Sequence, residues 1–174
     1  MHPELFLGRA FVIDANCIDS RRASPDIELL KLWRDEGRIF LNMTSVSQDE
    51  ASAGKSMARR RESFRFLAYR VEDDSAAVRS KRKAIEVVLF PSGVRSPNEQ
   101  NDVEICLACA YYGATLITRD GGSKRQPGGI LGNRTRLSAL GVNAMTPAEA
   151  VTHIRALIAK HEEYLAWRRA LPEI

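Results

Sequence analysis

Four acidic residues carry the strongest indication of function, because folding could bring their side chains to one point. They lie in the stretches FVIDAN, TSVSQDEA, NDVEICLA and LITRD, as Asp14, Glu50, Asp102 and Asp120. Two carboxylates about 4 Å apart repel each other by roughly 4 kcal/mol at an effective dielectric near 20. Four carboxylates in one cleft must therefore hold protons or bind divalent cations, and we expect cations.

The elements around these acids are predicted from hydrophobic periodicity and from helix-start and helix-stop signals. Apolar stretches predict strands at 10–13, 38–43, 69–71, 114–118 and 142–145. Helical patterns predict helices at 26–36, 44–53, 56–68, 75–90, 97–112 and 147–171. Strands that alternate with helices favour a parallel sheet covered on both faces. We therefore predict an α/β chain with three αβα layers, a central parallel sheet of about five strands, and one domain over residues 1–174.

The predicted sheet would place the acids at a shared edge. Asp14 and Asp120 each follow a strand, and ligands of open parallel sheets bind beyond the carboxyl ends of the strands. Asp102 and Glu104 are two positions apart on a helix, so only one of them can face that edge. The glycine-rich stretch 121–133 is predicted to be a loop without regular structure.

Some acids also have a purely structural interpretation. Glu50 follows Ser47 by three positions, which predicts a capping box at a helix start. The same spacing relates Ser96 to Glu99 and Thr146 to Glu149.

Composition narrows the class of protein. The chain has 174 residues, a formal charge of +4 and no apolar run near the roughly 18 residues that a membrane span needs. The N-terminal MHPELFLGRAFVID lacks the order of a signal peptide, so we expect a cytoplasmic protein. Cys17, Cys106 and Cys109 are predicted to be buried free thiols, because the three histidines lie far from them in the sequence and do not complete a zinc site.

Basic residues are the natural counterpart of a polyanionic substrate. They cluster at 59–61, at 79–83, and at Lys124 with Arg125. Together with Arg119, Lys124 and Arg125 are predicted to hold phosphates beside the acids, which favours a nucleic acid substrate. The alternative interpretation is that the first two clusters are solvated helix faces and that the stretch with Lys124 and Arg125 is a flexible surface loop without function. The stretch GGSKRQPGG lacks the GK[ST] ending of a nucleotide-binding P-loop.

Taken together, the acidic motifs resemble those of PIN-domain ribonucleases, and within that family the chain is similar to the toxins of VapBC toxin–antitoxin systems. The resemblance rests on VIDAN, TSVSQDEA and NDVEICLACAYYGATLITRD, with VNAMTPAEAV similar to the closing strand and helix. It covers most of the chain from Phe11 to Val151. After Asp120 the chain departs from the family pattern, since it continues with GGSKRQPGGILGN.

This resemblance implies a PIN-like fold and a Mg²⁺- or Mn²⁺-dependent endoribonuclease that cuts single-stranded RNA to leave a 5′ phosphate and a 3′ hydroxyl. It assigns catalysis and metal binding to Asp14, Glu50, Asp102 and Asp120. It selects Asp102 over Glu104, and Glu50 over Asp49. Asn16 and Thr118 become accessory polar positions. A homodimer and a small antitoxin protein are the partners that the resemblance implies.

Two other functions remain open at the level of the sequence. A magnesium-dependent phosphatase that forms an aspartyl phosphate also uses an aspartate at a strand end. Such enzymes usually carry a second aspartate two positions later, where this chain has Asn16. The second alternative is a non-catalytic RNA-binding or scaffold protein with the same fold.

Overall fold

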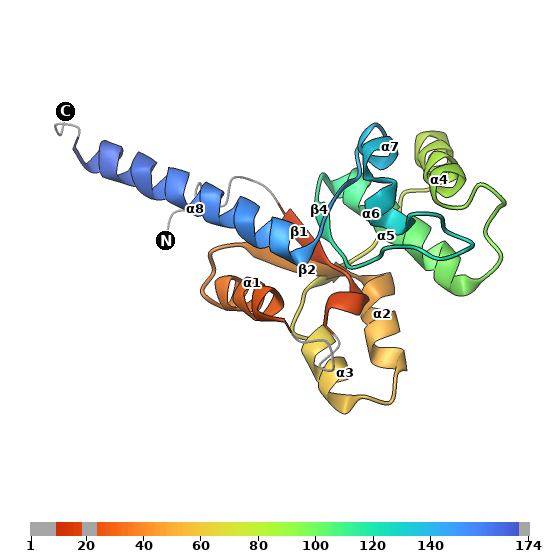
Figure 1. Ribbon diagram of the computed structural model, residues 1–174, viewed down its shortest axis with the longest axis horizontal. Helices are drawn as coiled ribbons and strands as arrows, with labels where there is room; N and C mark the ends of the chain where they lie inside the picture. The colour runs from red at the N-terminus through yellow and green to blue at the C-terminus, as the bar shows by residue number, and fades with distance from the viewer. Residues whose placement is uncertain (1–9, 19–23, 171–174) are drawn as a thin grey trace.

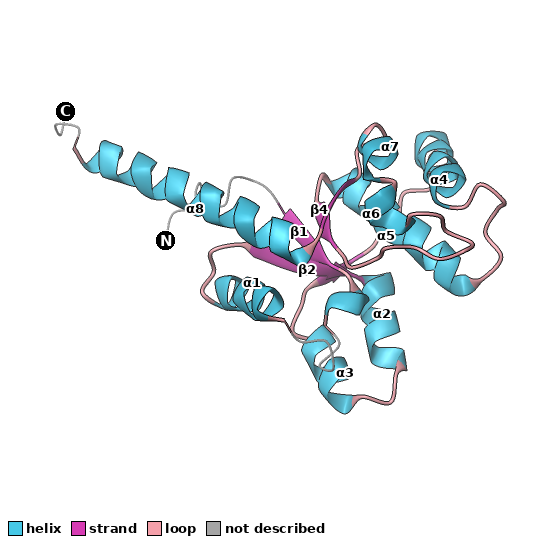
Figure 2. Cartoon of the chain, viewed as in Figure 1, coloured by secondary structure: helices cyan, strands magenta, loops and turns pink. Residues whose placement is uncertain are grey.

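A five-stranded parallel sheet forms the centre of the computed structural model, which describes residues 10–18 and 24–170. The strand order is β3-β2-β1-β4-β5, and each neighbouring pair is parallel. Figure 2 shows the strands of the sheet in magenta among the cyan helices. The strands are β1 (Ala10–Ile13), β2 (Phe40–Thr44), β3 (Ala68–Tyr69), β4 (Thr115–Ile117) and β5 (Asn143–Met145). The predicted α/β class and parallel sheet of five strands are confirmed.

Helices flank the sheet (Figure 1). They are α1 (Pro25–Asp35), α2 (Ser45–Ala53), α3 (Met57–Ser63), α4 (Ala76–Leu89), α5 (Pro97–Tyr112), α6 (Gly129–Gly132), α7 (Arg134–Ser138) and α8 (Pro147–Arg169), with a short 3₁₀ helix, η2 (Ala15–Cys17). Two predictions were wrong. The helix predicted for 56–68 ends at Ser63, and the stretch 121–133 is not wholly irregular, because it contains α6. The last predicted residue of the closing helix, Leu171, lies outside the described residues.

Side chains of the central strand alternate between two hydrophobic clusters, one on each face of the sheet. Phe11 and Ile13 join the cluster that includes residues of α1 and α8. Val12 joins the cluster that includes residues of α4 and α5. Because successive side chains of a strand point to opposite faces, burial on both sides explains why 10–13 is apolar throughout.

Helix α5 lies deep in the second cluster. Its buried residues include Cys106 and Cys109, and all three cysteines of the chain are buried and free, as predicted. The helix ends at Gly113, whose φ of 64° is a left-handed conformation that glycine adopts without a side-chain clash. The buried residues of α5 begin at Val103, so the helix is anchored immediately after Asp102.

The residues that cap the helices in the structure differ in part from the predicted capping boxes. Thr44, not Ser47, caps α2 by accepting a hydrogen bond from the backbone N–H of Ser47. Glu50 therefore has no capping role, and the capping-box prediction for it was wrong. The predicted box at Thr146 and Glu149 is confirmed at the start of α8.

The first turns of α8 pack on the sheet through Val151 and Ile154, whereas its later turns extend away from the body of the protein (Figure 1). Within the described part of the chain, no helix combines the length and apolar character needed to span a membrane.

Candidate active site

Asp14 lies at the carboxyl end of β1, next to the end of β4. Its backbone N–H donates to the carbonyl of Ile117 at 3.0 Å, which continues the pairing of the two strands. Its side chain is buried, and Oδ2 accepts hydrogen bonds from Thr118 Oγ1 and Asn16 Nδ2, both at 2.7 Å. These contacts hold the carboxylate in one orientation.

The predicted accessory positions Asn16 and Thr118 lie in contact with Asp14 and with each other. Asn16 Nδ2 also donates to Thr118 Oγ1 at 3.1 Å, and Asn16 Oδ1 accepts from the backbone N–H of Arg119 at 3.1 Å. Thr118 Oγ1 accepts in turn from the backbone N–H of Asp120, at 3.1 Å. This network fixes the two strand ends against each other and determines where Asp120 begins its turn.

Asp102 lies in the second turn of α5 and interacts electrostatically with the other three acids. Burial is the main reason that its pKa rises from 3.8 to about 8, and the charges of Asp120, Asp14 and Glu50 raise it further. Glu104, by contrast, is paired with Arg82 at 2.9 Å. The structure therefore brings Asp102, and not Glu104, to the acidic cluster.

Glu50 approaches the cluster from α2. Its charge contributes to the rise in the pKa of Asp14 from 3.8 to about 6, for which burial is the largest cause and which the Thr118 hydrogen bond partly offsets. Glu50 Oε1 accepts a hydrogen bond from Asn101 Nδ2 at 2.6 Å. Asn101 lies immediately before Asp102 and was missed in the sequence, where no spacing rule points to it.

Asp120 is held differently, because the chain that follows it folds back onto its carboxylate. The backbone N–H of Gly122 donates to Oδ1 at 3.0 Å, and that of Ile130 donates to Oδ2 at 2.7 Å. The carbonyl of Asp120 accepts from the N–H of Leu131 at 3.2 Å. Each carboxylate oxygen has a second lone pair, so Asp120 can still bind a ligand while it organises the loop.

Two glycines make this fold-back possible. Gly122 and Gly129 have φ values of 93° and 58°, and their backbones touch. A Cβ atom on Gly129 would lie 2.7 Å from Asp120 Oδ2 and would also overlap the backbone of Gly122. The loop that follows Asp120, where the sequence departs from the pattern of the resembled family, thus forms an ordered cradle around the Asp120 carboxylate.

Gln126 is a further site residue that sequence reasoning missed. It belongs to the same loop, is 5% exposed, and acts on Asp102 as a hydrogen-bonding partner that lowers the carboxyl's pKa. The contact is loose, because among the described residues the buried Nε2 of Gln126 has no partner with ordinary hydrogen-bond geometry. A glutamine in a glycine-rich loop carries no sequence signal for such a position.

The predicted phosphate-binding residues lie in different surroundings. Arg125 forms an ion pair with Glu99 at 2.5 Å, near the start of α5. Arg119 Nη2 donates to Ser24 Oγ at 2.8 Å, and Lys124 is exposed. Arg125 therefore holds the loop against α5, and its contact with phosphate stays a prediction.

The types of side chain in the acidic cluster determine which metal ion it could bind. Within residues 10–18 and 24–170, no three histidine, cysteine, aspartate or glutamate side chains are arranged to hold one ion together. An ion here would have one or two direct carboxylate ligands and would keep several waters. Mg²⁺ is commonly bound in that way, with substrate phosphate completing the shell, whereas structural zinc requires four protein ligands. The carboxylate donors are of the type that Mg²⁺ and Mn²⁺ prefer, and joint ligation of one ion by Asp14, Glu50, Asp102 and Asp120 stays a prediction.

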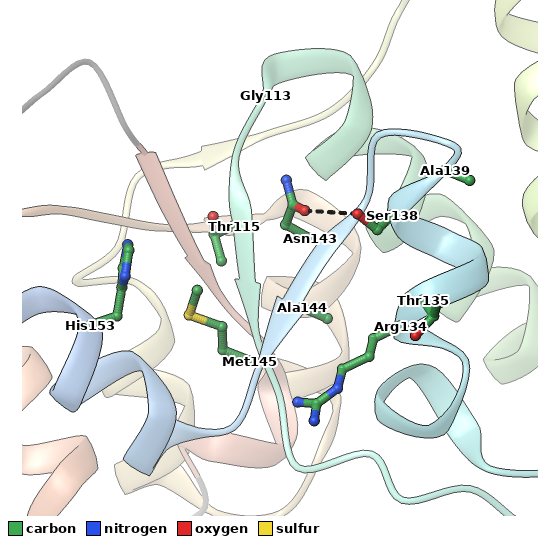
Figure 3. Close-up of a pocket in the computed structure, with 10 residues that line it drawn as sticks. All are labelled: Gly113, Thr115, Arg134, Thr135, Ser138, Ala139, Asn143, Ala144, Met145 and His153. Carbon is green, nitrogen blue, oxygen red and sulfur yellow. Dashed lines mark hydrogen bonds between the residues drawn. The ribbon is translucent and has the colours of Figure 1, made fainter.

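A separate cavity of about 770 Å³ lies beside the edge strand β5 (Figure 3). Its lining includes His153 and Arg134, and Arg134 is paired with Glu149 at 2.8 Å. No carboxylate is among the residues described around it. The cavity therefore lacks the hard oxygen donors of the acidic cluster and is a poorer candidate for metal-dependent hydrolysis.

Comparison with known proteins adds no assignment: the chain matches none of the protein-family models and none of the curated proteins that were searched.

The raised pKa values predict how stability depends on pH in the metal-free protein. Between about pH 5 and pH 8, folded Asp102 (pKa about 8) and Asp14 (about 6) retain protons that the unfolded chain, with pKa near 3.8, has lost. The free energy of unfolding should therefore fall as the pH rises through this range. Urea unfolding with a chelator present measures it.

The variant Asp102→Asn should flatten this dependence between about pH 6 and 8, where Asp102 is the group still titrating. The exposed Asp49→Asn should leave it unchanged. Unfolding free energies of the native chain that stay constant or increase over this range would contradict the electrostatic account.

The cradle around Asp120 generates a second prediction. Gly129→Ala should lower the free energy of unfolding by about 2 kcal/mol or more, because it adds an unfavourable left-handed conformation to a steric overlap. Gly132→Ala is the matched control, since its Cβ would enter open space and its φ is not positive. Chemical denaturation compares the two, and equal stability of both variants would refute the cradle.

Proposed function

We propose that this protein is a divalent-metal-dependent endoribonuclease that hydrolyses phosphodiester bonds of single-stranded RNA. The observation that carries the proposal is the environment of Asp102, a half-buried carboxylate whose main charged neighbours are three other carboxylates. A cluster of this kind is costly for stability unless a cation or a proton relieves it. Clusters of perturbed acids are found preferentially at functional sites.

The roles of the acids follow from their surroundings. Burial and neighbouring carboxylates disfavour the charged forms of Asp102 and Asp14, and a bound cation would relieve that cost, so we assign these two as the direct ligands of an ion. Asp120 has both oxygens engaged by backbone N–H groups, which suits an outer ligand or a water-positioning role. Glu50, held by Asn101, can accept a proton from an attacking water. The bound metal would lower the pKa of water and stabilise charge at phosphorus.

The substrate class rests on charge and access. Arg119, Lys124 and Arg125 follow β4 in the chain, close to Asp120, and can neutralise phosphates on either side of a scissile bond. A scissile phosphate has to approach carboxylates that are buried or half-buried, which a flexible single strand does more readily than a duplex. In-line attack by water would leave a 5′ phosphate and a 3′ hydroxyl.

The finer assignment extends the resemblance of the motifs. A PIN-like fold is compatible with the strand order and with acids at the ends of β1 and β4. A toxin role in the cytoplasm, with a homodimer and a small antitoxin protein as partners, belongs to the same proposal. The phosphatase alternative is weaker, because Asn16 binds Asp14 Oδ2 at the position where a second aspartate would be needed.

RNA cleavage is the direct test. With Mn²⁺, the purified protein should cut single-stranded RNA internally, and mapped ends should carry a 5′ phosphate and a 3′ hydroxyl. Chelator should abolish cleavage. Asp14→Asn should lower the rate about 100-fold or more, because metal-assisted charge stabilisation contributes several kcal/mol and each 1.36 kcal/mol is tenfold in rate.

The matched control is Asp49→Asn, an exposed acid next to Glu50, which should keep full activity. Release of phosphate from small phosphomonoesters without RNA cleavage would favour the phosphatase. RNA binding without cleavage under any divalent metal would favour the scaffold protein.

A further inference from the structure

A row of arginine and apolar side chains covers one side of α3. Met57, Arg60, Arg61 and Phe64 follow the spacing that places residues on one helix face, and Leu67 comes shortly after the helix. All five are exposed, Phe64 by 59% and Leu67 by 78%. We refer to these five residues as the α3 face.

Helix α3 is anchored to the elements that carry two of the acids. Arg59 Nη2 donates to the carbonyl of Ala15 at 2.9 Å, and Ala15 directly follows Asp14. Gln48 of α2, the helix that carries Glu50, donates through Nε2 to the carbonyl of Ser63 at 2.9 Å. Figure 1 shows α3 beside α2 and η2. Helix α3 therefore packs on α2 and on η2, the elements next to Glu50 and Asp14, and the α3 face lies on its outer side.

The charge of this face has one sign. Arg60 and Arg61 are exposed on it, and the acid of α3, Glu62, is turned away from it. Glu62 is 16% exposed at its side chain and is paired with Arg65 and Lys31. Glu62 is therefore occupied elsewhere, and the α3 face is complementary to an anion.

The apolar part of the face suits unstacked bases. The Arg60 guanidinium lies 6.0 Å from the centre of the Phe64 ring, so a cation and an aromatic surface are presented side by side. Proteins that bind single strands combine a basic track for the backbone with aromatic rings on which bases stack. Duplex RNA keeps its bases stacked and offers mainly backbone and 2′-hydroxyl groups.

We infer that the α3 face binds a segment of the single-stranded RNA substrate, with arginines on its phosphates and a base on Phe64. This inference rests on the proposed function, because it deepens the recognition of the same substrate. It also assigns a role to the basic cluster 59–61, for which a solvated helix face was the alternative.

The test measures binding separately from cleavage. Affinity for a fluorescent single-stranded RNA is determined by anisotropy with the full chain carrying Asp14→Asn, without divalent metal. Adding Phe64→Ala should weaken binding at least about fivefold, the low end for loss of one stacked base. Adding Arg60→Gln and Arg61→Gln should reduce the slope of log K against log salt by about 1.4, as expected for two lost phosphate contacts on a single strand.

Matched substitutions keep the result specific. Arg79→Gln with Lys81→Gln removes the same charge from α4, whose exposed basic residues lie on another helix, and should change neither affinity nor slope by as much. Phe64→Tyr keeps an aromatic ring and should retain binding. Unfolding midpoints check that every variant is folded.

The outcomes separate this inference from the proposed function. Affinity and salt slope that stay unchanged in the α3 variants would overturn the inference, even if the native chain cuts RNA. Loss of binding in these variants, with the α4 control unaffected, would support it. That result would stand even if the native chain never cuts, in which case the proposed nuclease function alone would fail.

Discussion

Repulsion between Asp102 and the carboxylates of Asp120, Asp14 and Glu50 is the constraint on which the rest of the site depends. Parallel strands bring their carboxyl ends to the same edge, so Asp14 and Asp120 come together as soon as the sheet forms. Helix α5 then adds Asp102 in a half-buried position, where desolvation and its neighbours disfavour charge. A fold that assembles these acids accepts a free-energy cost, which a bound cation would reverse. The metal-dependent function that we propose rests on this relief of repulsion by a bound cation.

The surrounding structure is organised to keep the acids in place despite their repulsion. Thr118 and Asn16 hold Asp14, Asn101 holds Glu50, and two backbone N–H groups hold Asp120. Most of these donors are uncharged, so they orient the carboxylates without neutralising them. Near neutral pH the metal-free cluster is therefore ordered, and Asp102 keeps a proton that a bound cation would displace. Preorganised oxygen donors of this kind suit an ion that retains part of its water shell.

Much of the fold and the positions of the acids could be predicted from the sequence. An apolar run ends at Asp14, and another lies between Gly113 and Asp120. Both runs predicted a strand and the residue after which it ends, because burial on both faces makes a strand continuously apolar. The conformation of the loop after Asp120 could not be predicted, because the backbones of Gly122 and Gly129 are in contact. Hydrophobic periodicity reports buried side chains and gives no sign of such a contact. Gln126 and Asn101 were missed for the same reason: their roles depend on distant partners. The proposed cap at Ser47 failed because Thr44, three residues earlier, supplied the hydroxyl.

Direct measurement of Mn²⁺ binding tests the central claim without reference to any substrate. Titration calorimetry or electron paramagnetic resonance would count the ions bound by the native chain, by Asp102→Asn and by Glu104→Gln. Glu104 lies on the same helix but pairs with Arg82, so it controls for the loss of one negative charge. The account predicts Mn²⁺ binding in the native chain and in Glu104→Gln, and its loss in Asp102→Asn. Absence of binding to the native chain, or binding that Asp102→Asn leaves intact, would contradict it.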